Sequence, residues 1–167
     1  DFSKIDAGKL TVQASPLDPL QLVTDAMSLI EGAAKDKGLM FYQQYKGISA
    51  VPLLRTAAEA GDSEAQYYLA ETLRLNAMHI TAEAQKWYEA AAEQGEVYAM
   101  LRLSGKGDDL CVAMGNCPSD QKTPYEWLML ARKTASARAA QGDPAILELP
   151  AHTKSLGQPV AARIAEL

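Results

Sequence analysis

The amino-acid sequence predicts an all-α protein in which antiparallel helix pairs stack into a short solenoid, preceded by a small N-terminal helix/strand remnant. The first supporting observation is a repeat with a period of 34 residues, which relates Gly61 to Gly95 and Leu69 to Leu103. A fixed period of this length is typical of stacked α/α repeats. The second observation is the spacing of apolar residues by three and four positions, which marks one buried face on each predicted helix. Two to three helix pairs are expected.

The composition is that of a globular protein, and it limits the classes of function. Of 167 residues, 48% are hydrophobic and 22% are charged, and the formal net charge is −5. This acidic balance argues against nucleic-acid binding, which needs a basic surface. The sequence has no run of about 18 apolar residues, so we expect no membrane span.

Residues 1–40 differ in sequence pattern from the rest of the chain. The opening residues have the spacing of the end of an amphipathic helix, and residues 10–14 alternate as a short strand does. A helix is predicted over residues 19–37, because Asp18 is a suitable N-cap and a proline follows it. Gly38 is expected to end this helix.

Two segments of this region, DFSKIDAGKL and PLQLVTDAMSLIEGAAKDKGL, resemble bacterial sensor histidine kinases. The first is similar to the end of their dimerisation helix, and the second to the first helix of their ATP-binding domain. The resemblance covers only residues 1–40 and includes neither the phospho-accepting histidine nor the Asp-x-Gly-x-Gly nucleotide loops of that family. It therefore implies a vestigial or fused fragment without kinase activity, which serves for packing, as a linker or as a terminal cap of the helix stack.

The central region is predicted to form four helices and to begin a further one at Thr123-Pro124. Their expected ranges are 51–60, 63–76, 82–94 and 96–104. Gly61 and Gly95 follow two of these helices and can adopt the left-handed conformation that ends a helix. Large aromatic residues recur at helical spacing and are assigned to the core, namely Tyr68, Trp87, Tyr88 and Trp127.

This region resembles the Sel-like repeat family, a relative of the tetratricopeptide repeats. The likeness rests on Ala57-Ala58-x-x-Gly61-Asp62-x-x-Ala65-x-x-x-Leu69-Ala70 and on Ala84-x-x-Trp87-Tyr88-x-x-Ala91-Ala92-x-x-Gly95. It covers residues 52–104 well and 124–146 partly, before Leu149-Pro150 interrupts the third copy. The chain is thereby divided into a kinase-like fragment at 1–40, a Sel-like repeat domain at 41–148 with an insertion at 105–123, and a divergent tail at 149–167.

The insertion has the composition of a loop and contains the only two cysteines, Cys111 and Cys117. We favour a local disulfide, which needs an oxidising compartment. Two reduced thiols and a metal site are the alternatives. Zinc usually takes four ligands, and only His79 and His152 remain to complete such a set. The cysteine pair and the frequent export of the family favour a periplasmic location, with the cytoplasm as the alternative.

No pattern of catalytic residues is found, so we expect a protein that is not an enzyme and has no cofactor or metal. The tetratricopeptide likeness implies a concave face that binds a protein or peptide partner. The residues expected on that face are Glu64, Tyr67, Glu71, Arg74 and Tyr98. Weak self-association is also expected. The alternative function is that of a signalling fragment that associates with a sensor histidine kinase through residues 1–40.

Overall fold

The computed structural model describes residues 18–147, and this part of the chain is helical without any strand. The predicted all-α fold is therefore confirmed. The strand expected at residues 10–14 and the tail from residue 149 onward lie outside the described residues. None of the described helices is long and apolar enough to cross a lipid bilayer.

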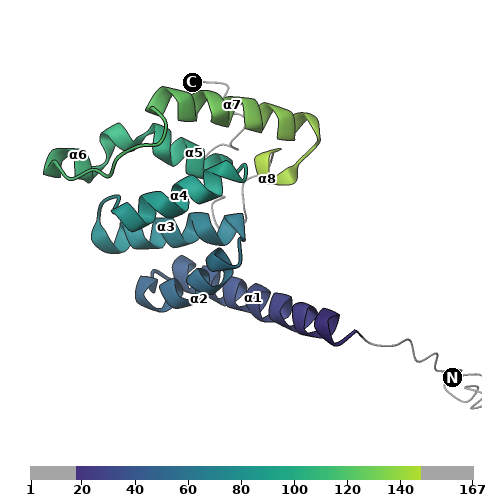
Figure 1. Ribbon diagram of the computed structural model, residues 1–167. Helices are drawn as coiled ribbons and strands as arrows, with labels where there is room; N and C mark the ends of the chain where they lie inside the picture. Colours follow the sequence, from purple (N-terminus) through teal and green to yellow (C-terminus); the bar gives the residue numbers. More distant parts are fainter. Residues whose placement is uncertain (1–17, 148–167) are drawn as a thin grey trace, which may run out of the picture.

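The helices form three antiparallel pairs, each packed on the next along the chain (Figure 1). The pairs are α1 (Pro19–Gln43) with α2 (Gly47–Glu59), α3 (Ser63–Ala77) with α4 (Ala82–Glu93), and α5 (Val97–Ser104) with α7 (Pro124–Ala140). The insertion between α5 and α7 contains a 3₁₀ helix, η1 (Lys106–Asp108), and α6 (Leu110–Met114). A single turn, α8 (Pro144–Leu147), follows α7 and packs against it.

Capping explains why the predicted boundaries of α3, α4 and α7 agree with the structure. The side chain of Asp62 accepts a hydrogen bond from the backbone N–H of Ala65 at 2.8 Å, and Thr81 caps α4 in the same way. Thr123 and Glu126 form a reciprocal capping box at the start of α7. These devices use residues within three positions of one another, so they can be recognised in the sequence.

Gly38 does not end α1, and the expectation that it would is wrong. The helix continues to Gln43, and Gly38 is buried where α2 crosses α1. A Cβ atom at this position would lie 2.8 Å from Cγ of Leu54. The glycine therefore serves the close approach of two helices. Because α1 is continuous through residue 43, it also crosses the domain boundary predicted after residue 40.

Two further expectations about local structure are corrected. Helix α2 begins at Gly47, four residues before the predicted start at residue 51, and accommodates Pro52 in its interior. The insertion is not entirely a loop, because it contains η1 and α6. Both segments look irregular in sequence because they contain glycine or proline, but their packing against the stack decides their structure.

The core consists of two adjoining apolar clusters. One fills the space between α1, α2 and α3 around Leu54 and Leu69, and the other extends from α3 to α8 around Tyr88 and Trp127. Tyr68 is buried as well, so three of the four predicted core aromatics are buried, while Trp87 is partly buried between the two clusters.

Candidate functional site

Helices α1, α3 and α5 are the first helices of the three pairs and meet along one side of the stack, which we call the α1–α3–α5 face. Aromatic rings connect these helices. The ring of Tyr42 on α1 lies 5.1 Å from that of Tyr68 on α3, and the ring of Tyr67 on α3 lies 6.0 Å from that of Tyr98 on α5. The face is therefore continuous from the first pair to the third.

A buried carboxylate lies at the centre of this face. Glu71 is 3% exposed, and its Oε1 accepts hydrogen bonds from the Tyr88 hydroxyl at 2.6 Å and from Nε of Arg102 at 2.8 Å. Its Oε2 accepts from Arg74 at 3.1 Å and from the second nitrogen of Arg102 at 3.3 Å. We call these four residues, from α3, α4 and α5, the Glu71 cluster.

The environment keeps Glu71 ionised. Burial acts to raise the pKa of its carboxyl, but the positive charges of Arg102 and Arg74 and the hydrogen bond from Tyr88 outweigh burial, so the pKa lies below its usual value. Burial raises the pKa of the Tyr88 hydroxyl far above its usual value, and the negative charge of Glu71 adds to this effect. The cluster thus holds one carboxylate, two guanidinium groups and a neutral phenol at neutral pH.

Tyr67 fills the space beside this cluster. Its ring contacts those of Tyr68 at 5.1 Å, Tyr88 at 6.2 Å and Tyr98 at 6.0 Å between centroids. Burial, followed by the charge of Glu71, raises the pKa of the Tyr67 hydroxyl well above its usual value. Tyr67 therefore supports the face by packing, and its hydroxyl remains neutral.

The cluster leaves an excess of one positive charge, because two arginines share one carboxylate. The side chain of Arg102 is 41% exposed, although its guanidinium bridges α5 to Glu71 on α3. Arg74 is less exposed, and its Nε has no hydrogen-bond partner. A guanidinium group beside tyrosine rings is suited to binding a carboxylate of a partner.

Four of the five predicted binding residues come together in or beside this cluster, namely Tyr67, Glu71, Arg74 and Tyr98. The expectation that Glu71 points outward to a partner is corrected, because its carboxylate is buried and occupied by three side chains. Glu64 lies apart, near the start of α3, where its carboxylate is 3.2 Å from the ammonium of Lys35 on α1.

Sequence reasoning missed Arg102 and the polar role of Tyr88. Arg102 lies four residues after Tyr98 and hence on the same side of α5, so helical spacing could have placed it on the face. Nothing in the sequence indicates that the hydroxyl of Tyr88, on the second helix of its pair, reaches the α1–α3–α5 face.

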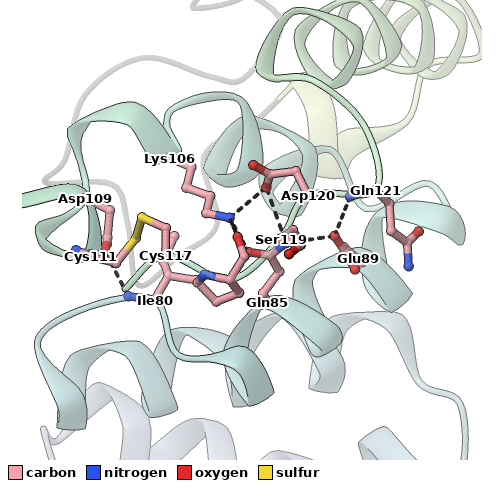
Figure 2. Close-up of polar contacts among 11 residues, drawn as sticks. Ile80, Gln85, Glu89, Lys106, Asp109, Cys111, Cys117, Ser119, Asp120 and Gln121 are labelled. Carbon is pink, nitrogen blue, oxygen red and sulfur yellow. Dashed lines mark hydrogen bonds and ion pairs between the residues drawn. A yellow bond between two sulfur atoms is a disulfide. The ribbon is translucent and has the colours of Figure 1, made fainter. Parts of the chain in front are cut away.

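The insertion is held on α4 by a second polar cluster, the Lys106 network (Figure 2). Lys106 is 4% exposed, and its ammonium contacts Oε1 of Gln85 at 2.5 Å, Oδ1 of Asp120 at 2.8 Å and the backbone carbonyl of Pro118. Gln85 in turn donates to Oε1 of Glu89 at 3.0 Å. The ammonium is thus surrounded by acceptors, as a buried charge requires.

A disulfide closes the insertion beside this network. The sulfur atoms of Cys111 and Cys117 are 1.99 Å apart, so the predicted pairing is confirmed. Oδ1 of Asp109 accepts hydrogen bonds from the backbone N–H groups of Cys111 and Ile80, both at 2.9 Å, and so connects the insertion to the turn between α3 and α4 (Figure 2). Within residues 18–147, no group of three or more histidine, cysteine or acidic side chains is placed to hold a metal ion.

The two histidines considered as metal ligands are not brought together with the cysteines in the described structure. Nδ1 of His79 is 2.9 Å from the carbonyl oxygen of Ala77, a local contact at the end of α3. His152 lies outside the described residues.

Comparisons with protein-family models, with curated proteins and with solved structures found no match to this chain.

Proposed function

We propose that this chain is a non-enzymatic helical-repeat scaffold that binds a protein or peptide partner on the α1–α3–α5 face. The likeness of residues 52–146 to Sel-like repeats is part of this proposal. Stacked helix pairs present the first helix of each pair along one continuous surface, which can contact an extended segment or a helix of a partner. The tyrosines and arginines described above belong to the residue types enriched at protein interfaces.

The observation that carries the proposal is the position of Arg102. Its guanidinium is fixed by two hydrogen bonds to Glu71, and its side chain is still 41% exposed. A side chain already held in place loses less conformational freedom when it binds a ligand. Because Arg74 and Arg102 together outweigh the charge of Glu71, the preferred partner presents acidic side chains or a terminal carboxylate.

A displayed library of random peptides, selected on the immobilised full chain, tests this function. We expect the selected peptides to be enriched in aspartate and glutamate. In fluorescence anisotropy, Arg102→Gln should weaken their binding by about tenfold or more, as loss of a charged hydrogen bond does. Arg74→Gln should weaken binding as well.

Lys133→Gln is the matched control, because it removes the same charge from an exposed position on α7. It should leave the affinity unchanged, and thermal unfolding should show that each variant is folded. Equal affinities for wild type and Arg102→Gln, or selected peptides without acidic enrichment, would refute the proposed binding face.

We further propose that the protein works in an oxidising compartment, such as the periplasm. The support is the pair of sulfur atoms at bonding distance, since disulfides persist in such compartments and are rare in the cytosol. Trapping the thiols by rapid acid quenching and alkylation in the native cells tests this. Free thiols at both positions in vivo would indicate a reducing compartment instead.

A further inference from the structure

The first half of α1 extends beyond the stack, and we call residues 18–30 the α1 overhang (Figure 1). Its origin is a difference in length, because α1 has 25 residues and its antiparallel neighbour α2 has 13. At a rise of about 1.5 Å per residue, α2 leaves about 18 Å of α1 without a neighbouring helix from the described part of the chain. Every residue of the overhang is exposed.

The overhang carries an apolar seam rather than a polar surface. Leu20, Val23, Met27 and Ile30 are between 55% and 74% exposed. Their spacings of three, four and three residues are those of the a and d positions of a coiled coil. Such spacing keeps the apolar side chains facing one partner helix along the whole contact, which favours a helix as the occupant.

Charge argues against a membrane surface as the occupant. Helices that lie on anionic membranes carry Lys and Arg on their polar face. The overhang contains neither, and its only charged side chains are Asp18 and Asp25. Asp25 lies on the side opposite the seam, so a partner helix would not meet it.

We propose that the α1 overhang pairs with the same segment of a second copy of this chain, in antiparallel orientation. An antiparallel pair centred near Asp25 places Leu20 against Ile30 of the second copy and Val23 against Met27 of the second copy. Each Ala26 is one residue from the centre, so the two copies lie about 3 Å apart along the helix axis, and this small side chain allows the helices to approach closely. The apolar seam is self-complementary in this arrangement.

The position of the stack explains the orientation. Helices α2 to α8 all lie toward the C-terminal end of α1 (Figure 1). Antiparallel pairing places the two stacks at opposite ends of the shared contact, whereas parallel pairing would bring both stacks to the same end. The contact is about 18 Å long and about 10 Å wide. Its area is therefore smaller than that of a stable interface, which buries about 800 Å² per partner. We therefore expect a weak dimer that forms reversibly.

Sedimentation velocity of the full chain from about 10 µM to about 1 mM tests the pairing. We expect a shift from monomer to dimer with rising concentration. Val23→Lys/Met27→Lys places four positive charges in the paired seam and should abolish the shift. Gln21→Lys/Ser28→Lys adds the same charge to the opposite side of the overhang and should preserve it.

Cysteine cross-linking tests the orientation. Ala26→Cys should form a disulfide-linked dimer under mild oxidation. Ala33→Cys should not, because antiparallel pairing separates the two copies of residue 33 by roughly 24 Å. Equal cross-linking at both positions would show parallel pairing and overturn the orientation.

Three results would overturn the proposal. The first is a full chain that stays monomeric over the whole concentration range. This result would also be obtained if another segment of the same chain covered the seam. The second is a dimer that persists in Val23→Lys/Met27→Lys. The third is a dimer that is lost in the control variant to the same degree. The binding of acidic peptides at Arg102 is measured independently, so failure of one proposal leaves the other open to its own test.

Discussion

Arg102 on α5 and Glu71 on α3 join two consecutive helix pairs, with Nε of the arginine 2.8 Å from Oε1 of the carboxylate. The two residues are 31 positions apart, close to one repeat period. Tyr88 from α4 bonds to the same oxygen atom, so three helices meet at one carboxylate. The Glu71 cluster is therefore both a part of the proposed binding face and a connection between repeats.

Replacing Glu71 with alanine should destabilise the protein by about 2–3 kcal/mol. Removing one partner of a fully buried ion pair typically costs about 3–5 kcal/mol, but Arg102 is partly exposed, and solvent stabilises its guanidinium when the carboxylate is lost. Urea unfolding followed by circular dichroism measures the change.

The ion pair between Glu83 and Arg55 is the control for this measurement, because the Glu83 side chain is 44% exposed whereas that of Glu71 is 4% exposed. Glu83→Ala should cost at most about 1 kcal/mol. Equal losses in the two variants would show that the burial of Glu71 does not matter for stability.

The same carboxylate should make stability depend on pH in the acidic range. The pKa of Glu71 is lower in the folded state than its ordinary value. The unfolded chain therefore takes up the proton first as the pH falls, and this favours unfolding. The stabilisation by Glu71 is complete above the unfolded pKa of about 4.3 and is lost as the pH falls through the folded pKa. Thermal unfolding between about pH 7 and pH 2.5 should show a larger fall for wild type than for Glu71→Gln.

Glu96 provides a comparison of opposite sign. Burial raises the pKa of its carboxyl above the usual value. Ionisation of Glu96 is therefore less favourable in the folded protein than in the unfolded chain. Stability falls as the pH rises from the pKa of the unfolded chain through the higher pKa of the folded protein. Glu96→Gln should therefore stabilise the protein more at about pH 7 than at about pH 3. The pH argument would be wrong if both glutamine variants changed the profile in the same direction.

The repeat fold and most helix boundaries could be predicted because their signals are local or periodic. The caps at Asp62, Thr81 and Thr123 each involve residues within three positions of one another. The disulfide could be favoured for a similar reason, since Cys111 and Cys117 are separated by only six positions. Such features depend little on how the rest of the chain folds.

Other features depend on residues that are distant in sequence. Gly38 can either end a helix or admit a neighbouring one, and only the position of Leu54 on α2 decides between these roles. Glu71 looks like an exposed helical glutamate until Tyr88 and Arg102 are brought to it. Lys106 likewise belongs to a loop-like sequence, and its burial follows from contacts with α4 that the sequence does not show.

The contact between Gly38 and Leu54 predicts the effect of alanine substitutions in α1. Gly38→Ala should destabilise the protein by about 1–3 kcal/mol, because the new methyl group would lie 2.8 Å from Cγ and 3.1 Å from the backbone nitrogen of Leu54. Gly32 is the matched control in the same helix, since a Cβ there meets nothing within 4 Å.

Gly32→Ala should stabilise the protein by up to about 1 kcal/mol, because alanine is the better helix former. Chemical denaturation of the two variants beside wild type measures both effects. Equal stability of Gly38→Ala and Gly32→Ala would contradict the close packing of α1 against α2 at residue 38.

Reduction of the disulfide should loosen the insertion and lower the free energy of unfolding by about 2 kcal/mol. A short loop such as that between Cys111 and Cys117 restricts the unfolded chain only modestly, which sets this magnitude. The urea midpoint of wild type should fall when a phosphine reductant is added. Cys111→Ala/Cys117→Ala should start at the lower midpoint and should not respond to the reductant.

Alkylation of the unfolded, unreduced protein followed by mass spectrometry provides the chemical check, because disulfide-bonded cysteines do not react. Modification of both cysteines, or a reductant effect of equal size in the double variant, would contradict the stabilising role of the disulfide.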